Sequence, residues 1–203
     1  MNDLLAEAVK VLHLGGVVAH PTETCYGLAA DVFSKAGVRK VYDLKGMDMG
    51  KPVSILVRDL EEAQRYGEFS PLAVKLALAY WPGPLTVIVP RKGGGDGAAA
   101  TLPVWFNPGV EWIGFRVSSN KKTRELVEAF AGPLTTTSAN KTGQAAPYSV
   151  QEILKQGLVP DFVLDGGQIG RTEASTVVKV IPGDGEEDDR LEILRQGPIQ
   201  LQV

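Results

Sequence analysis

The sequence predicts an α/β fold, in which one domain over residues 1–203 contains a mixed β-sheet and flanking helices. Two observations predict it. Short apolar runs typical of buried strands alternate with segments whose apolar residues recur at helical spacing. The last two strand-like runs, residues 175–180 and 191–194, follow each other directly and indicate a hairpin. Hairpin strands are antiparallel, so the sheet is not purely parallel.

The first elements are a helix, a strand and a second helix. Apolar residues at helical spacing predict a helix over residues 4–12. The apolar run 17–20 predicts a strand, which Pro21 ends because proline has no N–H to donate to a sheet. Ser34 can cap the second helix, which would carry Lys45 at its C-terminal end.

The remaining elements continue this alternation. Asp59 can cap a helix, Ser70 and Pro71 start another, and Ser149 with Glu152 forms a capping box. Together with the apolar runs, these signals predict helices over 60–66, 72–80, 121–131 and 149–156, and strands over 53–57, 85–89, 112–117, 134–137 and 162–164 before the hairpin. The glycine-rich stretch 90–100 predicts a flexible loop that either covers a site or is disordered.

Composition and charge exclude several classes of protein. The formal net charge is −3 and 44% of residues are hydrophobic, so any nucleic-acid contact would be local. No apolar run approaches the ~18 residues of a membrane span, and we see no signal peptide, so we expect a cytoplasmic protein with no membrane contact. The single cysteine, Cys25, cannot form an internal disulfide and is expected to fill a small apolar gap.

Polar side chains follow two predicted strands. Thr22, Thr24 and Tyr26 follow the first strand, and Ser138 and Asn140 follow a later one. Polar groups beyond strand ends in an α/β sheet are well placed to line a ligand crevice, although an ordinary strand-to-helix loop is an equal alternative for the first stretch. The full inventory adds Ser175 and the cations Lys45, Lys51, Arg116, Arg171 and Arg195.

This inventory suits the binding of a polyanion. Lysine supplies a point charge, arginine a fork for phosphate or carboxylate, and hydroxyls fix orientation without adding charge. The apolar neighbours of Arg116 favour a side chain that points into a cleft over one on a solvated edge. The chain lacks a phosphate-binding P-loop, a dinucleotide fingerprint, an H-E-x-x-H motif and a Ser-His-Asp order, and it has only two histidines. The pattern therefore favours phosphoryl or nucleotidyl transfer by positioning and charge neutralisation.

A series of sequence blocks, taken in order, resembles the YrdC/Sua5/TsaC family of threonylcarbamoyl-adenylate synthases. The blocks are residues 21–28, Lys45-Gly46, Lys51-Pro52, 81–86, Arg116, 137–140 with Gly143, 165–167, 175–178 and 194–197. The resemblance implies a YrdC-like (DHBP synthase-like) fold, in which a twisted mixed sheet forms a concave, positively charged site. It implies an enzyme that condenses L-threonine, bicarbonate and ATP to threonylcarbamoyl-AMP and pyrophosphate, with Mg²⁺ on the phosphates. A separate transferase would use the product to modify an adenosine beside the tRNA anticodon.

The resemblance also implies roles for individual residues. Thr24, Arg116 and Thr136 would bind threonine, with Arg116 on its carboxylate. Lys45, Lys51, Ser138, Asn140, Ser175 and Arg195 would bind ATP, and Lys45, Ser138 and Asn140 are the expected catalytic residues. Thr22 and Tyr26 would form the pocket wall.

The chain departs from the family pattern at several positions. Met47 stands where the family usually has an arginine near the triphosphate, and Leu56 stands where some members have a histidine. We hypothesise that Lys51 or Arg58 compensates for the missing arginine. Such departures resemble the YciO-like paralogues. The alternative function is therefore a paralogue that binds nucleotide or double-stranded RNA with weak or no synthase activity.

Overall fold

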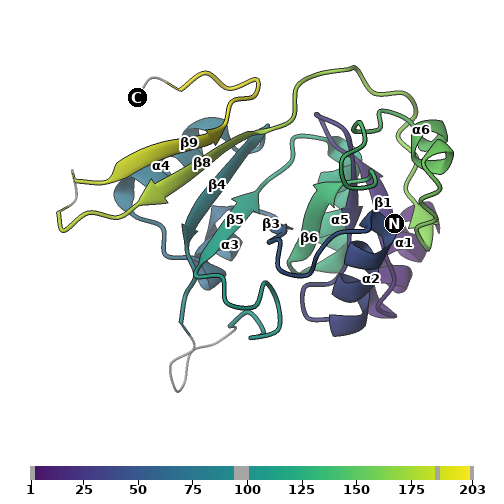
Figure 1. Ribbon diagram of the computed structural model, residues 1–203, viewed down its shortest axis with the longest axis horizontal. Helices are drawn as coiled ribbons and strands as arrows, with labels where there is room; N and C mark the ends of the chain where they lie inside the picture. The colour runs from purple at the N-terminus through teal and green to yellow at the C-terminus, as the bar shows by residue number, and fades with distance from the viewer. Residues whose placement is uncertain (1–2, 94–100, 186–187, 202–203) are drawn as a thin grey trace.

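The computed structural model of the protein describes residues 3–93, 101–185 and 188–201 (Figure 1). Its strands are β1 (Val18–Pro21), β2 (Tyr26–Ala29), β3 (Ser54–Leu56), β4 (Leu85–Pro90), β5 (Trp112–Arg116), β6 (Leu134–Ser138), β7 (Phe162–Val163), β8 (Thr176–Ile181) and β9 (Arg190–Arg195). Its helices are α1 (Asp3–His13), α2 (Lys35–Lys45), α3 (Leu60–Tyr66), α4 (Pro71–Tyr80), α5 (Lys121–Phe130) and α6 (Val150–Lys155).

Within the described residues the strands form one nine-stranded sheet in the order β7-β1-β2-β6-β3-β5-β4-β8-β9. The pairs β1–β7, β3–β5 and β4–β8 are parallel, and the other neighbours are antiparallel. The predicted mixed sheet and the predicted β8–β9 hairpin are confirmed. Strand β6 lies between β2 and β3, so the late loop that follows β6 meets the early loop that follows β1.

Local sequence signals set the helix ends. The side chains of Ser34, Asp59 and Ser149 each accept a hydrogen bond from the backbone N–H three residues later, at the starts of α2, α3 and α6. These predicted caps are confirmed. Helix α2 ends at Gly46, whose φ of 57° lies in the left-handed region that favours glycine. The helix therefore stops immediately after Lys45, and Lys45 faces the interior.

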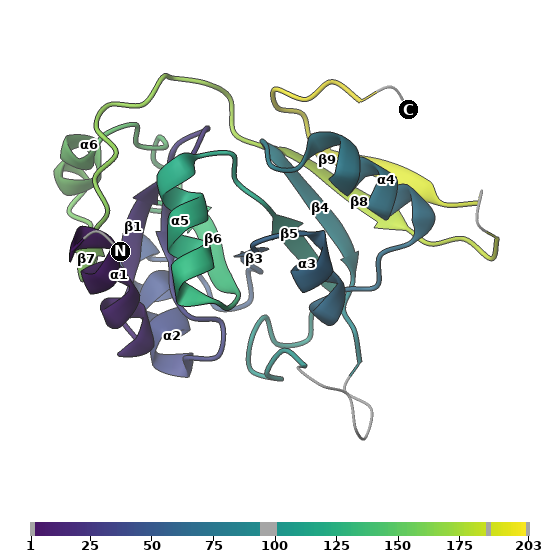
Figure 2. The ribbon, with the colours of Figure 1, turned by 180° about the vertical axis from the view of Figure 1, so that it is seen from behind.

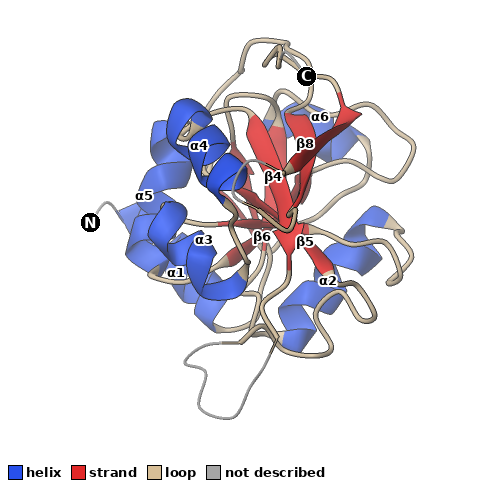
Figure 3. Ribbon diagram, turned by 90° about the vertical axis from the view of Figure 1, so that its left-hand side faces the viewer, coloured by secondary structure: helices blue, strands red, loops and turns tan. Residues whose placement is uncertain are grey.

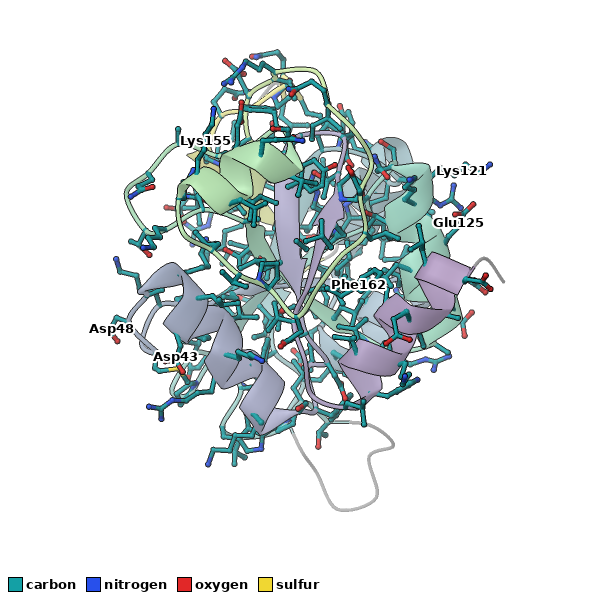
Figure 4. The ribbon with its side chains drawn as sticks, turned by 90° about the vertical axis from the view of Figure 1, so that its right-hand side faces the viewer. Asp43, Asp48, Lys121, Glu125, Lys155 and Phe162 are labelled. Atoms are coloured by element: carbon teal, nitrogen blue, oxygen red, sulfur yellow. The ribbon has the colours of Figure 1, made fainter. Side chains whose placement is uncertain are left out.

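Three clusters of buried apolar side chains hold the helices on the sheet. Helices α1 and α5 pack against β1, β2 and β6, where Figure 2 shows α5 lying over the strands. Helices α2 and α6 pack against the other face of β1 and β2. In Figure 4, Asp43 of α2 and Lys121 of α5 mark these opposite sides. Helices α3 and α4, with part of α2, cover one face of β3, β4, β5 and β8, and Figure 3 shows helices on both sides of the strands.

The structure corrects two expectations about the first strand. Pro21 pairs with Tyr26 as the last residue of β1, so the strand ends one residue later than predicted. The loop after it is a tight hairpin into β2, a strand that the sequence did not reveal because it has four residues and contains Gly27. Most of the predicted loop 90–100 lies outside the described residues. Among the residues described, no helix is both long enough and apolar enough to cross a membrane.

Candidate active site

A polar cavity of about 260 Å³ lies on the sheet face that α3 and α4 leave uncovered. Its lining comes from both hydroxyl-rich loops and from the middle of the sheet: Thr22, Thr24, Cys25, Gly27, Pro52, Val53, Ser54, Thr86, Arg116, Thr136, Thr137, Ser138, Ala146, Ala174, Ser175, Val177 and Arg195. Ser54 pairs directly with Thr136, and directly paired residues point to the same face of a sheet. The strand register therefore gathers side chains that are far apart in the sequence.

Arg116 forms the charged centre of this cavity. Arg116 is only 7% exposed, and its Nη2 donates to Glu23 Oε1 at 2.8 Å and to Thr24 Oγ1 at 2.9 Å. The expectation that Arg116 points into a cleft is confirmed by its place in the lining. Burial alone would raise the pKa of Glu23, but the charge and hydrogen bond of Arg116 and a hydrogen bond from Ser118 outweigh burial and lower it. Glu23 is therefore a carboxylate at neutral pH.

The hydroxyls of the β1–β2 hairpin are ordered by a short chain of hydrogen bonds. Thr22 Oγ1 donates to the carbonyl of Cys25 at 2.7 Å, which commits its proton. Thr22 Oγ1 also accepts from the backbone N–H groups of Thr24 and Cys25, each at 3.1 Å, and lies 2.9 Å from Thr24 Oγ1. Thr24 Oγ1 accepts from Arg116.

A second polar group closes the cavity on the β8–β9 side. Arg195 donates from Nε to the carbonyl of Ser175 at 2.9 Å and from Nη2 to the Ser175 hydroxyl at 3.0 Å. Thr86 Oγ1 lies 3.1 Å from the same hydroxyl. Burial lowers the pKa of Arg195, and the charge of Arg116 adds to this. Two arginines thus face one cavity, an arrangement that favours an anionic ligand.

Four predicted site residues do not line the cavity. Tyr26 is fully buried, and its hydroxyl donates to the carbonyl of Gly167 at 2.8 Å, so it holds the 165–167 turn and is not the predicted pocket wall. The Asn140 amide nitrogen donates to carbonyls of its own loop, at Lys141 and Gln144, while its Oδ1 is buried with no partner among the described residues. Lys51 is exposed.

Lys45 is the fourth predicted site residue that does not line the cavity, and it lies just behind the lining residues. The residue is 4% exposed, and its Nζ donates to the carbonyls of Ser138 and Asn140, at 2.9 Å for Asn140. Both acceptors are neutral, so the ammonium charge has no close counterion in this network. Burial lowers the pKa of Lys45 from 10.5 to about 8, and the nearby Cys25 opposes the shift. A bound phosphate would supply the missing negative charge.

The resemblance implies that Lys45 binds ATP, and on that expectation its lowered pKa predicts a pH-dependent affinity for ATP. The ammonium charge is present below about pH 8 and is lost above it. We expect the dissociation constant for ATP to be flat between pH 6.5 and 7.5 and to rise towards about tenfold per pH unit above pH 8. Lys45→Ala should bind ATP more weakly with no such rise, as measured by titration calorimetry. An equal rise in Lys45→Ala and the wild type would contradict the assignment.

The structure also adds site residues that the sequence reasoning missed. Glu23 partners Arg116, and Thr86 contacts Ser175. Both positions lie inside sequence blocks of the family resemblance, and this was the sequence signal that could have identified them as site residues. Their partners are 93 and 89 residues away, so only the strand pairing could reveal the contacts.

A second cavity, of about 470 Å³, lies between α5 and the end of β3, and Leu56, Arg58 and Ser118 are among its lining residues. Arg58 pairs there with Asp59 at 3.1 Å. Arg58 lines this cavity and not the one that contains Arg116, which does not support the hypothesis that it compensates for the arginine missing at Met47. Met47 itself packs against the core cluster under α3 and α4.

Comparisons with known proteins identify the family and the fold. The sequence model of the Sua5_yciO_yrdC family, described as "Telomere recombination", matches residues 10–197. A threonylcarbamoyl-AMP synthase of Vibrio cholerae is 30% identical over 197 residues, which cover 95% of this chain and 97% of that protein.

Two solved structures share the fold. The P. abyssi Sua5 structure complexed with L-threonine has a TM-score of 0.81 at 26% identity. The match covers 95% of this chain and 54% of the Sua5 chain. E. coli YciO has a TM-score of 0.79 at 25% identity, covering 96% of this chain and 89% of YciO. The family match covers most of the sequence, and the predicted fold is confirmed. The chain belongs to the Sua5/YciO/YrdC family.

Proposed function

We propose that this protein is an L-threonylcarbamoyladenylate synthase, a nucleotidyltransferase. The observation that carries the proposal is the buried Arg116 fork, which lies beside ordered threonine hydroxyls and opposite the Ser175–Arg195 group in one cavity. The arginine fork suits the carboxylate of a free amino acid, and the second group suits a phosphate. The synthase name of the Vibrio cholerae relative and the threonine bound by Sua5 support this pairing.

The proposed reaction uses these groups for positioning and charge neutralisation. Arg116 would hold the threonine carboxylate, with Thr24 and Thr136 beside it. The threonine amine and bicarbonate form a carbamate with loss of water. A carbamate oxygen then attacks the α-phosphorus of ATP. The bond between the α-phosphorus and the oxygen that bridges to the β-phosphate breaks, and pyrophosphate leaves. Ser138, Asn140 and Ser175 would orient the nucleotide, and the cations Arg195, Lys45 and Lys51 would offset its charge.

We propose that Mg²⁺ arrives with ATP as part of the substrate. In the ranges that the structure describes, no group of three or more His, Cys, Asp and Glu side chains could hold a metal ion. Magnesium is commonly held by substrate phosphates and water with few protein ligands, so the hydroxyl-lined cavity fits such a complex. The ion would neutralise phosphate charge, and the chain's own residues would orient the triphosphate. The product would pass to a separate tRNA threonylcarbamoyl transferase.

One observation favours a second candidate, a YciO-like paralogue that binds nucleotide or double-stranded RNA with weak or no synthase activity. The family arginine is absent at Met47, and neither Arg58 nor Lys51 lines the cavity in its place. A missing phosphate-binding cation can reduce the rate by roughly 100-fold or more.

Pyrophosphate release distinguishes the two candidates. Wild-type protein is incubated with ATP and Mg²⁺ and with L-threonine and bicarbonate, each omitted in turn. We expect release only when both are present, and threonylcarbamoyl-AMP should appear in the same samples by mass spectrometry. Absence of release, in protein that still binds ATP, would overturn the synthase proposal. RNA titration at two salt concentrations would then test the paralogue, because phosphate contacts weaken steeply with salt.

A further inference from the structure

Glu23 lies behind Arg116 and is not among the residues that line the cavity. Its side chain is 17% exposed. One carboxylate oxygen, Oε1, accepts from Arg116 Nη2 at 2.8 Å, and the other, Oε2, accepts from Ser118 Oγ at 2.5 Å. Both oxygens are therefore engaged by the protein.

Ser118 is itself fixed at the start of α5. Its Oγ accepts from the backbone N–H of Asn120 at 3.2 Å, which leaves the hydroxyl proton to point at Glu23. Asn120 is the N-cap of α5 and accepts from the N–H groups of Lys122 and Thr123. The carboxylate is thus tied to a helix end that packs on the sheet.

The described hydrogen bonds of the Arg116 side chain all start from one nitrogen. Nη2 donates its two protons to Glu23 and Thr24. Nε is buried and has no acceptor among the described residues. Two bonds from one terminal nitrogen fix the orientation of the planar guanidinium, and the guanidinium keeps donors that the protein does not use.

We propose that Glu23 and Ser118 are positioning residues that hold the Arg116 guanidinium in the orientation that receives the carboxylate of the amino-acid substrate. The chain of hydrogen bonds runs from the start of α5 through Ser118 and Glu23 to Arg116. Glu23 touches no substrate and acts only through Arg116. This inference rests on the proposed function for the identity of the amino acid, whereas the restraint on Arg116 is a property of the protein alone.

The test compares Glu23→Ala, Glu23→Gln and Ser118→Ala with Ser119→Ala, the matched control, because Ser119 is an exposed neighbouring serine. In pyrophosphate release, we expect Glu23→Ala to raise the KM for threonine about 30-fold and to change the KM for ATP less than about threefold. Glu23→Gln keeps an oxygen for Arg116, so its KM for threonine should stay within about threefold of wild type. Ser118→Ala should raise that KM about threefold to fivefold, and Ser119→Ala should leave it unchanged.

A second measurement does not depend on the reaction. The ¹⁵N-edited NMR signal of the Arg116 Nε–H, identified by its loss in Arg116→Lys, should exchange slowly with water in the wild type and in Glu23→Gln. It should exchange at least about tenfold faster in Glu23→Ala, with an intermediate rate in Ser118→Ala. Ser118→Ala keeps the ion pair and serves as the test if Glu23→Ala does not fold.

The outcomes separate the inference from the proposed function. A wild-type protein that releases no pyrophosphate overturns the function, and the exchange rates then decide the restraint on Arg116 by themselves. An active wild type whose threonine KM and Arg116 exchange rate are unchanged in Glu23→Ala overturns the positioning role. Equal rises in the KM for threonine and for ATP would also overturn it, because they indicate a general structural effect.

Discussion

Replacing Arg116 with Gln is expected to weaken L-threonine binding at least about 100-fold while ATP binding changes less than about threefold. The reason is that Arg116 and Arg195 are the two charged residues among the described cavity lining, and Arg116 is the one proposed to hold the threonine carboxylate. Removing one partner of a hydrogen-bonded charge pair in a buried site typically costs 2–5 kcal/mol, or about 30-fold to several thousandfold. Titration calorimetry with each ligand measures both affinities directly.

The same substitution leaves Glu23 without its counterion, so a loss of folding has to be separated from a loss of binding. The side chains of Glu23 and Arg116 are 17% and 9% exposed, and an unpaired charge there should lower the free energy of unfolding by about 3 kcal/mol. The double variant Glu23→Gln with Arg116→Gln removes both charges and should recover most of that stability. It should not recover threonine binding. Recovery of binding in the double variant would show that Arg116 acts through the fold and not on the substrate.

Much of the fold could be predicted because the helix signals are local. Ser34, Asp59 and Ser149 cap helices through bonds to residues three positions away, so their roles are visible in the sequence. Strand β2 was missed because the polar stretch before Tyr26 and the glycine inside the strand resemble a loop. The strand order depends on contacts between distant segments, such as β6 between β2 and β3, which no local pattern encodes.

The candidate site was predictable in composition and less so in geometry. The hydroxyl-rich loops and Arg116 indicated a cavity, and they line one. The orientation of Lys45 was not predictable, because its ammonium donates to carbonyls more than ninety residues away. Glu23 was missed for the same reason, since a carboxylate in a polar loop suggests a solvated residue until its arginine partner is known. Whether the whole concave site is positively charged, as the resemblance implies, stays a prediction.

Gly197→Ala is expected to reduce both stability and ATP binding, because Gly197 lies against the backbone that carries Ser175. A Cβ at position 197 would lie 2.2 Å from the carbonyl oxygen of Ala174 and 2.6 Å from the backbone nitrogen of Thr176. Both are backbone atoms, so no side-chain rotation can relieve the contact. The backbone on one side has to move, which typically costs 1–3 kcal/mol in a packed region.

This movement should affect the nucleotide side of the cavity more than the threonine side. Ser175 and Arg195 flank the contact and are joined by two hydrogen bonds of about 3 Å, which depend on the spacing of the two segments. We expect Gly197→Ala to lower the free energy of unfolding by about 2 kcal/mol and to weaken ATP binding at least about tenfold. Gly170→Ala is the matched control, because a Cβ there meets no atom within 4 Å. If both variants retain ATP affinity while only Gly197→Ala loses stability, the Ser175–Arg195 pair supports the fold and does not hold the nucleotide.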